Sequence, residues 1–140
     1  MKRAMDHEAV QIMKLLMKRG ATRATLVRLA AAAARSVLPL VGNRRDEAMA
    51  AVESAERWAA NPNETNAKLA ENEVFRMLSC QDGSRSFREV FGLLAARNAA
   101  LACFHYETGL NAAVFAVECA AEAASGREVD LGAVITVALL

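Results

Sequence analysis

The stretch LAAAAAR, residues 29–35, decides the fold of this chain because it contains five consecutive alanines. Alanine loses no side-chain entropy when it enters a helix, and its small side chain lets two helix backbones approach closely. Further alanine-rich runs occupy residues 48–60, 95–102 and 112–124. The composition therefore predicts an all-α protein built from tightly packed helical hairpins.

Length and composition bound the size of the core. A chain of 140 residues is predicted to form one helical domain, residues 1–140. Hydrophobic residues make up 54% of the chain and aromatic residues only 5%, so the core must consist of many small aliphatic contacts. Each buried alanine contributes far less than the roughly 1.5–3 kcal/mol of a buried Leu or Phe. We expect a compact bundle of about six or seven helices packed as antiparallel hairpins, stabilised by continuous helix contact or by oligomerisation.

Capping and breaking residues separate the expected helices. Asn61-Pro62-Asn63-Glu64 is the clearest such boundary, because Asn61 can cap a helix in which Pro62 takes the first position. The expected helices run from an Asp6 cap to Arg19, from Thr22 or Thr25 to Leu38, from an Asn43 cap through Ala59, from an Asn61 cap to Cys80, from Ser84 or Ser86 to Gly109, from Leu110 to Ala124, and from an Asp130 cap onward.

The cysteines and the apolar runs bear on location. Cys80, Cys103 and Cys119 are an odd number without a Cys-x-x-Cys pair, and no signal peptide precedes them, which favours a cytoplasmic protein. The apolar run at the end of the chain is about half the ~20 residues that span a bilayer, so we expect no transmembrane segment. Residues 131–140 should instead dock into the core or join two subunits as a homo-oligomer.

Residues suited to catalysis or metal binding are few. His7 and His105 have no Cys, His, Asp or Glu partners at a metal-binding spacing, and the glycines are scattered singly, so no phosphate-binding loop is predicted. Cys103 and Cys119 lie among alanines and are expected in the core. Cys80 lies beside a loop, but no His or Asp pattern would activate it. We therefore expect a protein that is not an enzyme and that has no cofactor and no metal site.

Arg97 and Asn98 interrupt an alanine and leucine segment in the middle of a helix. Buried polar groups need partners, and Glu118 or Glu122 on the following helix could pair with Arg97. Such an ion pair would set the register of that hairpin. A ligand site at Arg97 and Asn98 is the alternative. An enzyme that uses Arg97, Cys103 and His105 is a more distant one.

The net charge of +1 hides an asymmetry between the two ends of the chain. Basic residues outnumber acidic ones by eight to two through Arg35, and the remainder of the chain is acidic. This pattern is typical of contact with nucleic acid or an anionic membrane, and it also occurs on an ordinary solvated helix face. The residues expected to carry such binding are Lys14, Lys18, Arg19, Arg23 and Arg28.

A resemblance covers residues 29–58. There the polyalanine helix is followed by Val37-Leu38-Pro39-Leu40, then by Arg44-Arg45, and then by AVESAERW at residues 51–58. This order resembles the Imm5-type immunity proteins of bacterial polymorphic-toxin systems. The resemblance implies a cytoplasmic, non-enzymatic helical protein that binds and neutralises a toxin.

Protein binding is accordingly the function we expect first. Arg44, Arg45 and Arg57 would contact the partner, together with Trp58 if its indole is exposed. A buried Trp58 would instead anchor the core or a hairpin. Binding of nucleic acid or an anionic surface through the basic N-terminal segment is the alternative function.

Overall fold

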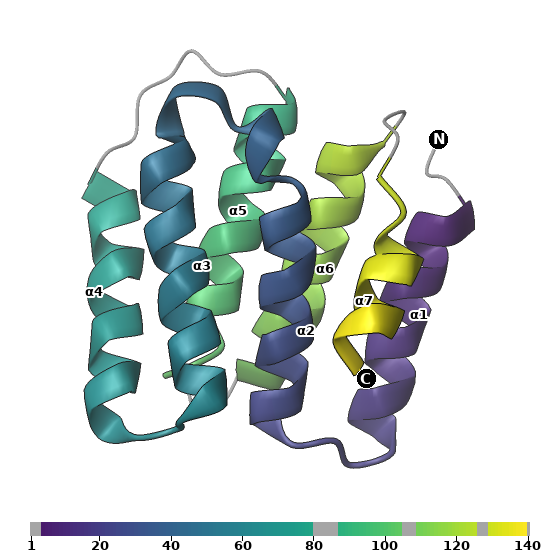
Figure 1. Ribbon diagram of the computed structural model, residues 1–140, viewed down its shortest axis with the longest axis horizontal. Helices are drawn as coiled ribbons and strands as arrows, with labels where there is room; N and C mark the ends of the chain where they lie inside the picture. Colours follow the sequence, from purple (N-terminus) through teal and green to yellow (C-terminus); the bar gives the residue numbers. More distant parts are fainter. Residues whose placement is uncertain (1–3, 80–86, 105–108, 126–128, 140) are drawn as a thin grey trace.

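The computed structural model describes residues 4–79, 87–104, 109–125 and 129–139. Within these ranges the chain forms seven α-helices and two 3₁₀-helices, with no strand (Figure 1). The prediction of an all-α helical bundle is confirmed. The elements are α1 (Ala4–Lys18), α2 (Arg23–Ser36), η1 (Leu38–Leu40), η2 (Gly42–Arg44), α3 (Arg45–Ala60), α4 (Glu64–Ser79), α5 (Phe87–Leu101), α6 (Gly109–Ala124) and α7 (Leu131–Leu139).

The helices are stacked in two layers around α2. Figure 1 shows α4, α3, α2 and α1 across the front, with α7 between α2 and α1 and with α5 and α6 behind. The most extensive packing joins α5 to α6, and α2 packs against α3, α5, α6 and α7. Helix α4 lies at one edge of the bundle, where it packs against α3 and α5.

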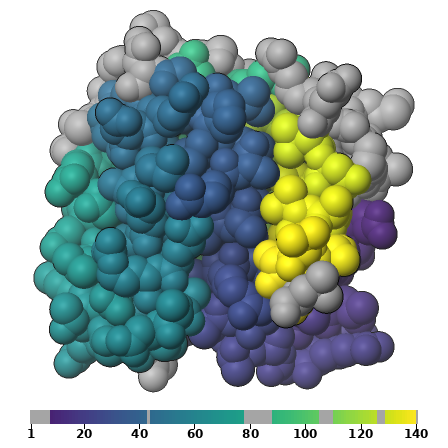
Figure 2. Space-filling model, viewed as in Figure 1, coloured from purple at the N-terminus to yellow at the C-terminus, as the bar shows by residue number. Residues whose placement is uncertain are grey.

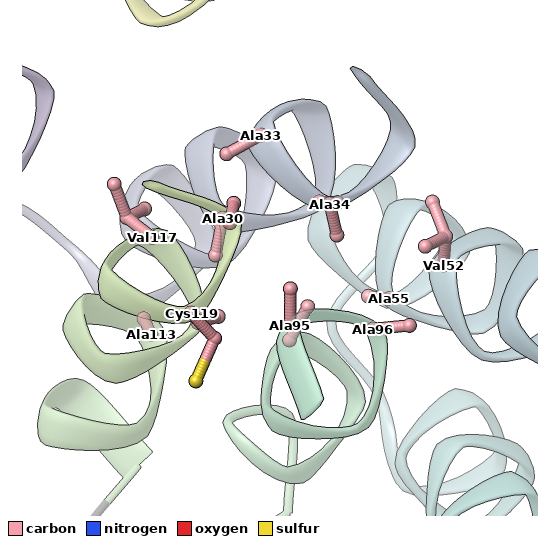
Figure 3. Packing of buried hydrophobic residues seen from close by; sticks show 14 of the residues in the cluster. Ala30, Ala33, Ala34, Val52, Ala55, Ala95, Ala96, Ala113, Val117 and Cys119 are labelled. Carbon is pink, nitrogen blue, oxygen red and sulfur yellow. The ribbon is translucent and has the colours of Figure 1, made fainter. Parts of the chain in front are cut away.

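Helix α2 owes its central position to its alanines. Ala30, Ala31, Ala33 and Ala34 are all fully buried, and only Ala32 of the five is partly exposed. Figure 3 shows small side chains from α2, α3, α5 and α6 meeting in the core. Because these side chains extend only one carbon from the backbone, α2 can contact helices on several sides at once.

The turn from α1 to α2 follows local capping rules. Gly20 has a φ of +83°, and the N–H groups of Gly20 and Ala21 donate to the carbonyls of Met17 and Leu16, which closes α1 in a Schellman motif. Thr22 then caps α2, its Oγ1 accepting from the Thr25 N–H at 3.2 Å. At the other end of α1 the expected cap is wrong, since Asp6 lies inside the helix.

The connection between α2 and α3 differs from the expectation. Helix α2 ends at Ser36 and not at Leu38, because Pro39 disfavours the α conformation at the residue before it. The chain continues through η1 and η2 with Gly42 at a φ of +61°, a conformation that glycine tolerates. Asn43 lies within η2, so the predicted Asn43 cap is wrong and Arg44 precedes α3 without a side-chain cap.

The cap of α4 is Asn63 and not the predicted Asn61. The Asn63 Oδ1 accepts from the Asn66 N–H at 2.8 Å, three residues on, as an N-cap requires. The Asn66 side chain in turn donates to the Asn61 carbonyl at 2.9 Å. The predicted Asp130 cap of α7 is confirmed, since the Asp130 Oδ1 accepts from the Ala133 N–H at 3.0 Å.

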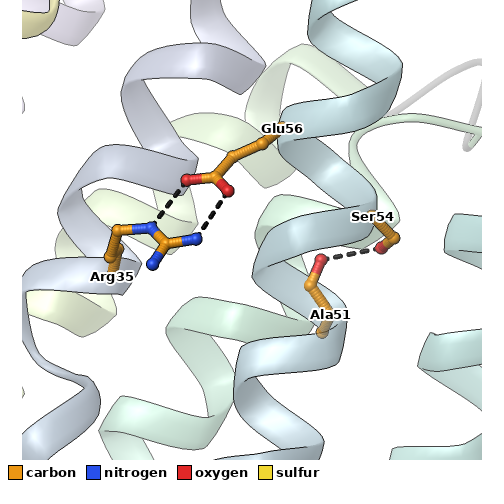
Figure 4. Close-up of polar contacts among 4 residues, drawn as sticks. All are labelled: Arg35, Ala51, Ser54 and Glu56. Carbon is orange, nitrogen blue, oxygen red and sulfur yellow. Dashed lines mark hydrogen bonds and ion pairs between the residues drawn. The ribbon is translucent and has the colours of Figure 1, made fainter.

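Ion pairs and side-chain caps join neighbouring helices. The Arg35 guanidinium of α2 donates through two nitrogens to the Glu56 carboxylate of α3, at 2.8 and 2.7 Å (Figure 4). This hydrogen bonding raises the pKa of Arg35 above its ordinary value, against a smaller lowering by burial. Arg88 at the start of α5 donates to the carbonyls of Ala123 and Ser125, which are exposed where α6 ends. In α3 the buried Ser54 hydroxyl donates to the Ala51 carbonyl at 2.7 Å.

Gly92 permits the closest approach between α5 and the α2–α3 connection. A Cβ at this position would lie 2.4 Å from Val41 Cγ1 and 3.8 Å from the Val37 carbonyl oxygen. Val37 and Val41 are fully buried, so Val41 has little room to move away. The absence of a side chain at Gly92 therefore sets how tightly α5 packs here.

We predict that Gly92→Ala lowers the free energy of unfolding, measured by urea denaturation, by about 1–3 kcal/mol through overpacking. The direction of the change in unfolding free energy distinguishes overpacking from helix propensity, because replacing glycine with alanine inside a helix ordinarily stabilises a protein by roughly 0.5–1 kcal/mol. In a Val41→Ala background the same substitution should cost little, since the methyl group it meets is gone. A stabilised Gly92→Ala protein would contradict the close contact.

Candidate functional site

The two cysteines that the structure describes are core residues. Cys103 and Cys119 are buried, as their alanine-rich surroundings predicted. Burial raises the pKa of the Cys103 thiol to about 12, and the nearby positive charge of Arg23 offsets part of that rise. A catalytic cysteine has a lowered pKa and an accessible sulfur. The Cys103 thiol has a raised pKa and is buried, so it does not suit the role of a nucleophile. Cys80, His105 and the loop around them lie outside the described residues.

Within the described part of the chain, no group of three His, Cys, Asp or Glu side chains is placed to hold a metal ion. The same part contains no helix long and apolar enough to cross a membrane.

The structure does not gather the predicted partner-binding residues into one place. Arg44 and Arg45 lie at the start of α3, and Arg57 lies three turns later near its end. Arg44 donates to Glu47 at 2.6 and 3.0 Å, so its charge is already paired, whereas Arg45 and Arg57 are exposed. Trp58 is only 8% exposed and belongs to the core cluster, so its indole anchors the interior and is not available as an exposed contact.

Arg97 and Asn98 are also placed differently from the expectation. Asn98 is buried and satisfies its amide locally, by donating to the Leu94 carbonyl one turn back at 2.8 Å. The predicted ion pair from Arg97 to Glu118 or Glu122 is not formed among the described residues. The register of the α5–α6 hairpin is instead set by alanine packing and by the Arg88 cap of α6.

An open groove lies along α4 at the edge of the bundle. It has a volume of about 570 Å³ and runs between the first turns of α4 and Phe104, just beyond the end of α5. Glu64, Lys68 and Glu71 line it at i, i+4 and i+7, and Lys68 pairs with Glu71 at 2.6 Å. The groove therefore combines a charged wall on α4 with an aromatic side chain on the opposite side.

Phe75 continues this wall one turn beyond the groove. It follows Glu71 by four residues, so it stands on the same row of α4 as Glu64, Lys68 and Glu71. Its side chain is 60% exposed, which is unusual for phenylalanine. The sequence analysis did not predict this surface, although the helix periodicity contains a signal for it. The apolar row of α4 that packs on the core consists of Ala67, Ala70, Val74 and Met77, and Phe75 lies outside this row.

The basic N-terminal residues form a second surface. We call Lys14, Lys18, Arg19, Arg23 and Arg28 the basic patch, which lies on α1, on the start of α2 and on the turn between them. All are exposed except Arg23, which is half-buried. No acidic residue occurs between residues 9 and 35, and Glu8 lies ten residues before the end of α1. The patch therefore gathers several like charges with no carboxylate between them in the sequence.

Neither a protein-family model, nor a curated protein, nor a solved structure matches this chain.

We predict that Cys103 and Cys119 do not react with an aromatic disulfide reagent at pH 8 in a Cys80→Ser protein until it is denatured. With a pKa of about 12, roughly one Cys103 thiol in 10⁴ is ionised at that pH. Because the unfolded thiol ionises near its ordinary 9.0, the free energy of unfolding should be unaffected by Cys103 below pH 9 and should fall between pH 9 and 12. Rapid reaction of the native protein would contradict this burial.

Proposed function

We propose that this chain is a non-enzymatic helical module that binds another protein along α4. The observation that carries the proposal is Phe75, a largely exposed aromatic side chain on the same row of α4 as the charged residues that line the groove. Aromatic side chains are enriched at protein interfaces, where they supply most of the binding energy within a polar rim. Lys68 and Glu71 supply such a rim here.

The shape of the surface favours a protein partner over a small molecule. Small ligands are held in concave sites that bury most of their surface. The α4 groove is open, and its row of side chains continues to Phe75 beyond it. A partner helix or extended segment lying along α4 would cover both the groove and Phe75, and so would bury the exposed ring.

The resemblance of residues 29–58 to Imm5-type immunity proteins supports a narrower form of the proposal. In that form the protein is cytoplasmic and its partner is a toxin, which it neutralises by binding. The exposed Arg45 and Arg57 would then add charged contacts from α3, the helix that packs against α4.

Native mass spectrometry of the tagged protein, recovered gently from its own source cells, tests this proposal. We expect a stoichiometric protein adduct, and we expect Phe75→Ser to reduce the adduct at least about tenfold, as loss of an aromatic anchor does. Val90→Ser on α5 is the matched control, because it removes another exposed apolar side chain and should leave the adduct unchanged. An adduct that survives Phe75→Ser together with Lys68→Glu would place the interface elsewhere.

The basic patch supports a second candidate function, the binding of nucleic acid or an anionic membrane surface. The sequence from residue 9 to residue 35, which carries its lysines and arginines, contains no acidic residue. Arg35, by contrast, is paired with Glu56 on α3 at 2.7 Å and does not belong to the patch. Attraction of this kind depends on charge alone and is weakened by salt.

We predict that binding of a fluorescent DNA duplex, followed by anisotropy, weakens steeply as salt is raised. Contact with about four phosphates corresponds to a slope of roughly −3 to −4 in log K against log salt concentration. Lys18→Glu with Arg19→Glu should abolish this binding, whereas Arg76→Glu on α4 should leave it unchanged. If duplex binding changes neither with salt concentration nor in the Lys18→Glu, Arg19→Glu variant, the basic patch is excluded as the DNA contact.

A further inference from the structure

Helix α7 presents an uncovered apolar surface. Leu131 and Ile135 are fully buried where α7 packs on α1 and α2. On the opposite side Val137 is 68% exposed, and Leu139, one turn after Ile135 on the buried row, is still 37% exposed at the end of the helix. No charged residue occurs between residues 131 and 139. Only one side of α7 is therefore used by the fold, and its last turns leave large aliphatic side chains in water.

This apolar surface ends beside the basic patch. Figure 1 shows α1 and α7 running in the same direction, so that α7 ends beside the second half of α1 and points toward the turn between α1 and α2. Figure 2 shows the last turns of α7 on the surface, directly above the end of α1 and the start of α2. Those two segments contribute Lys18, Arg19 and Arg23 to the patch.

Helix α1 repeats the same combination of side chains. Leu15 is about half exposed, and around the helix it stands between Lys18 and Arg19. Lys14 lies one turn before Lys18 on the same row. The neighbouring helices α1 and α7 therefore both carry exposed aliphatic side chains, and on α1 cationic side chains flank Leu15.

We propose that the α1 and α7 side of the molecule docks onto the surface of an anionic lipid bilayer. Val137, Leu139 and Leu15 would enter the boundary between headgroups and acyl chains, and the basic patch would lie against the anionic headgroups. This inference rests on the second proposed function, and it adds the apolar contact and the choice of a membrane.

The combination of charges and apolar side chains favours a bilayer over other occupants. Nucleic acid is bound mainly through its phosphates, which offer no apolar environment to Val137 and Leu139. A second copy meeting this face symmetrically would bring two basic patches together, and like charges across an interface oppose association. An anionic bilayer satisfies both features at once, because negative headgroups overlie a hydrocarbon interior.

Sedimentation with vesicles tests the proposal on the full chain. We expect binding to phosphatidylcholine vesicles that contain phosphatidylserine and little binding to phosphatidylcholine alone. Val137→Ser with Leu139→Ser should weaken the partition constant about tenfold, because less apolar area is buried. Lys18→Glu with Arg19→Glu should weaken it by more than about tenfold. Phe75→Ser and Arg76→Glu on α4 are the matched controls and should bind like the original protein.

A second variant keeps the test decisive if the serine variants fold poorly. In a Trp58→Phe background, a tryptophan introduced as Val137→Trp replaces an exposed side chain. We expect its emission to shift to shorter wavelength when the phosphatidylserine vesicles are added, because the indole enters an apolar environment. An unshifted emission from bound protein would overturn the insertion of α7.

The remaining outcomes separate this inference from the function on which it rests. Vesicle binding that needs Lys18 and Arg19 but not Val137 and Leu139 would overturn the apolar contact and leave the charge-based function intact. Duplex binding without vesicle binding would overturn the choice of a membrane. Loss of self-association in the serine variants, with unchanged vesicle binding, would identify the α7 face as an interface between copies and overturn the inference.

Discussion

Close packing of the α2 alanines against α3, α5 and α6 is the constraint on which the rest of this structure depends. A buried methyl group contributes only about 0.8 kcal/mol, so stability requires many such contacts in continuous rows. The α5–α6 hairpin, with alanines on both facing surfaces, extends the same packing behind α2. Gly92 shows how little free space remains, since even one added carbon there would meet Val41. Enlarging a side chain at such a close contact is therefore poorly accommodated.

The same close packing also explains why some bulky apolar side chains lie on the surface. Where facing helices meet through alanine, bulky residues outside the buried rows have no interior site to occupy. Phe75 is left exposed on α4, which lies at one edge of the bundle, and Val137 is left exposed on α7, which lies between α1 and α2 (Figure 1). The two apolar surfaces differ in their charged surroundings. A paired lysine and glutamate accompany the α4 surface, whereas the basic patch lies next to α7. That difference is why the two surfaces are assigned different partners.

The positive charges divide into those that hold the fold together and those left over. Arg35 joins α2 to α3 through Glu56, and Arg88 caps the end of α6 from α5. Both are held in defined geometry by acceptors on other helices. Lys18 and Arg19, near the end of α1, oppose the partial negative charge of the helix terminus and need no specific acceptor. Their exposed charge remains available to a partner.

The sequence by itself determined the helical class, the approximate positions of the helices and the burial of Cys103 and Cys119. Helix propensity, capping and glycine termination act within a few residues of the chain, so they can be inferred without knowing the neighbours. Even so, Asn61 and Asn63 compete for one cap, and only the structure shows that Asn63 takes it. Tertiary packing alone decided that Trp58 is buried, that Arg97 lacks the expected ion pair, and that Phe75 and Val137 face outward. Exposure depends on which helices meet and at what angle, and those contacts join residues far apart in the chain.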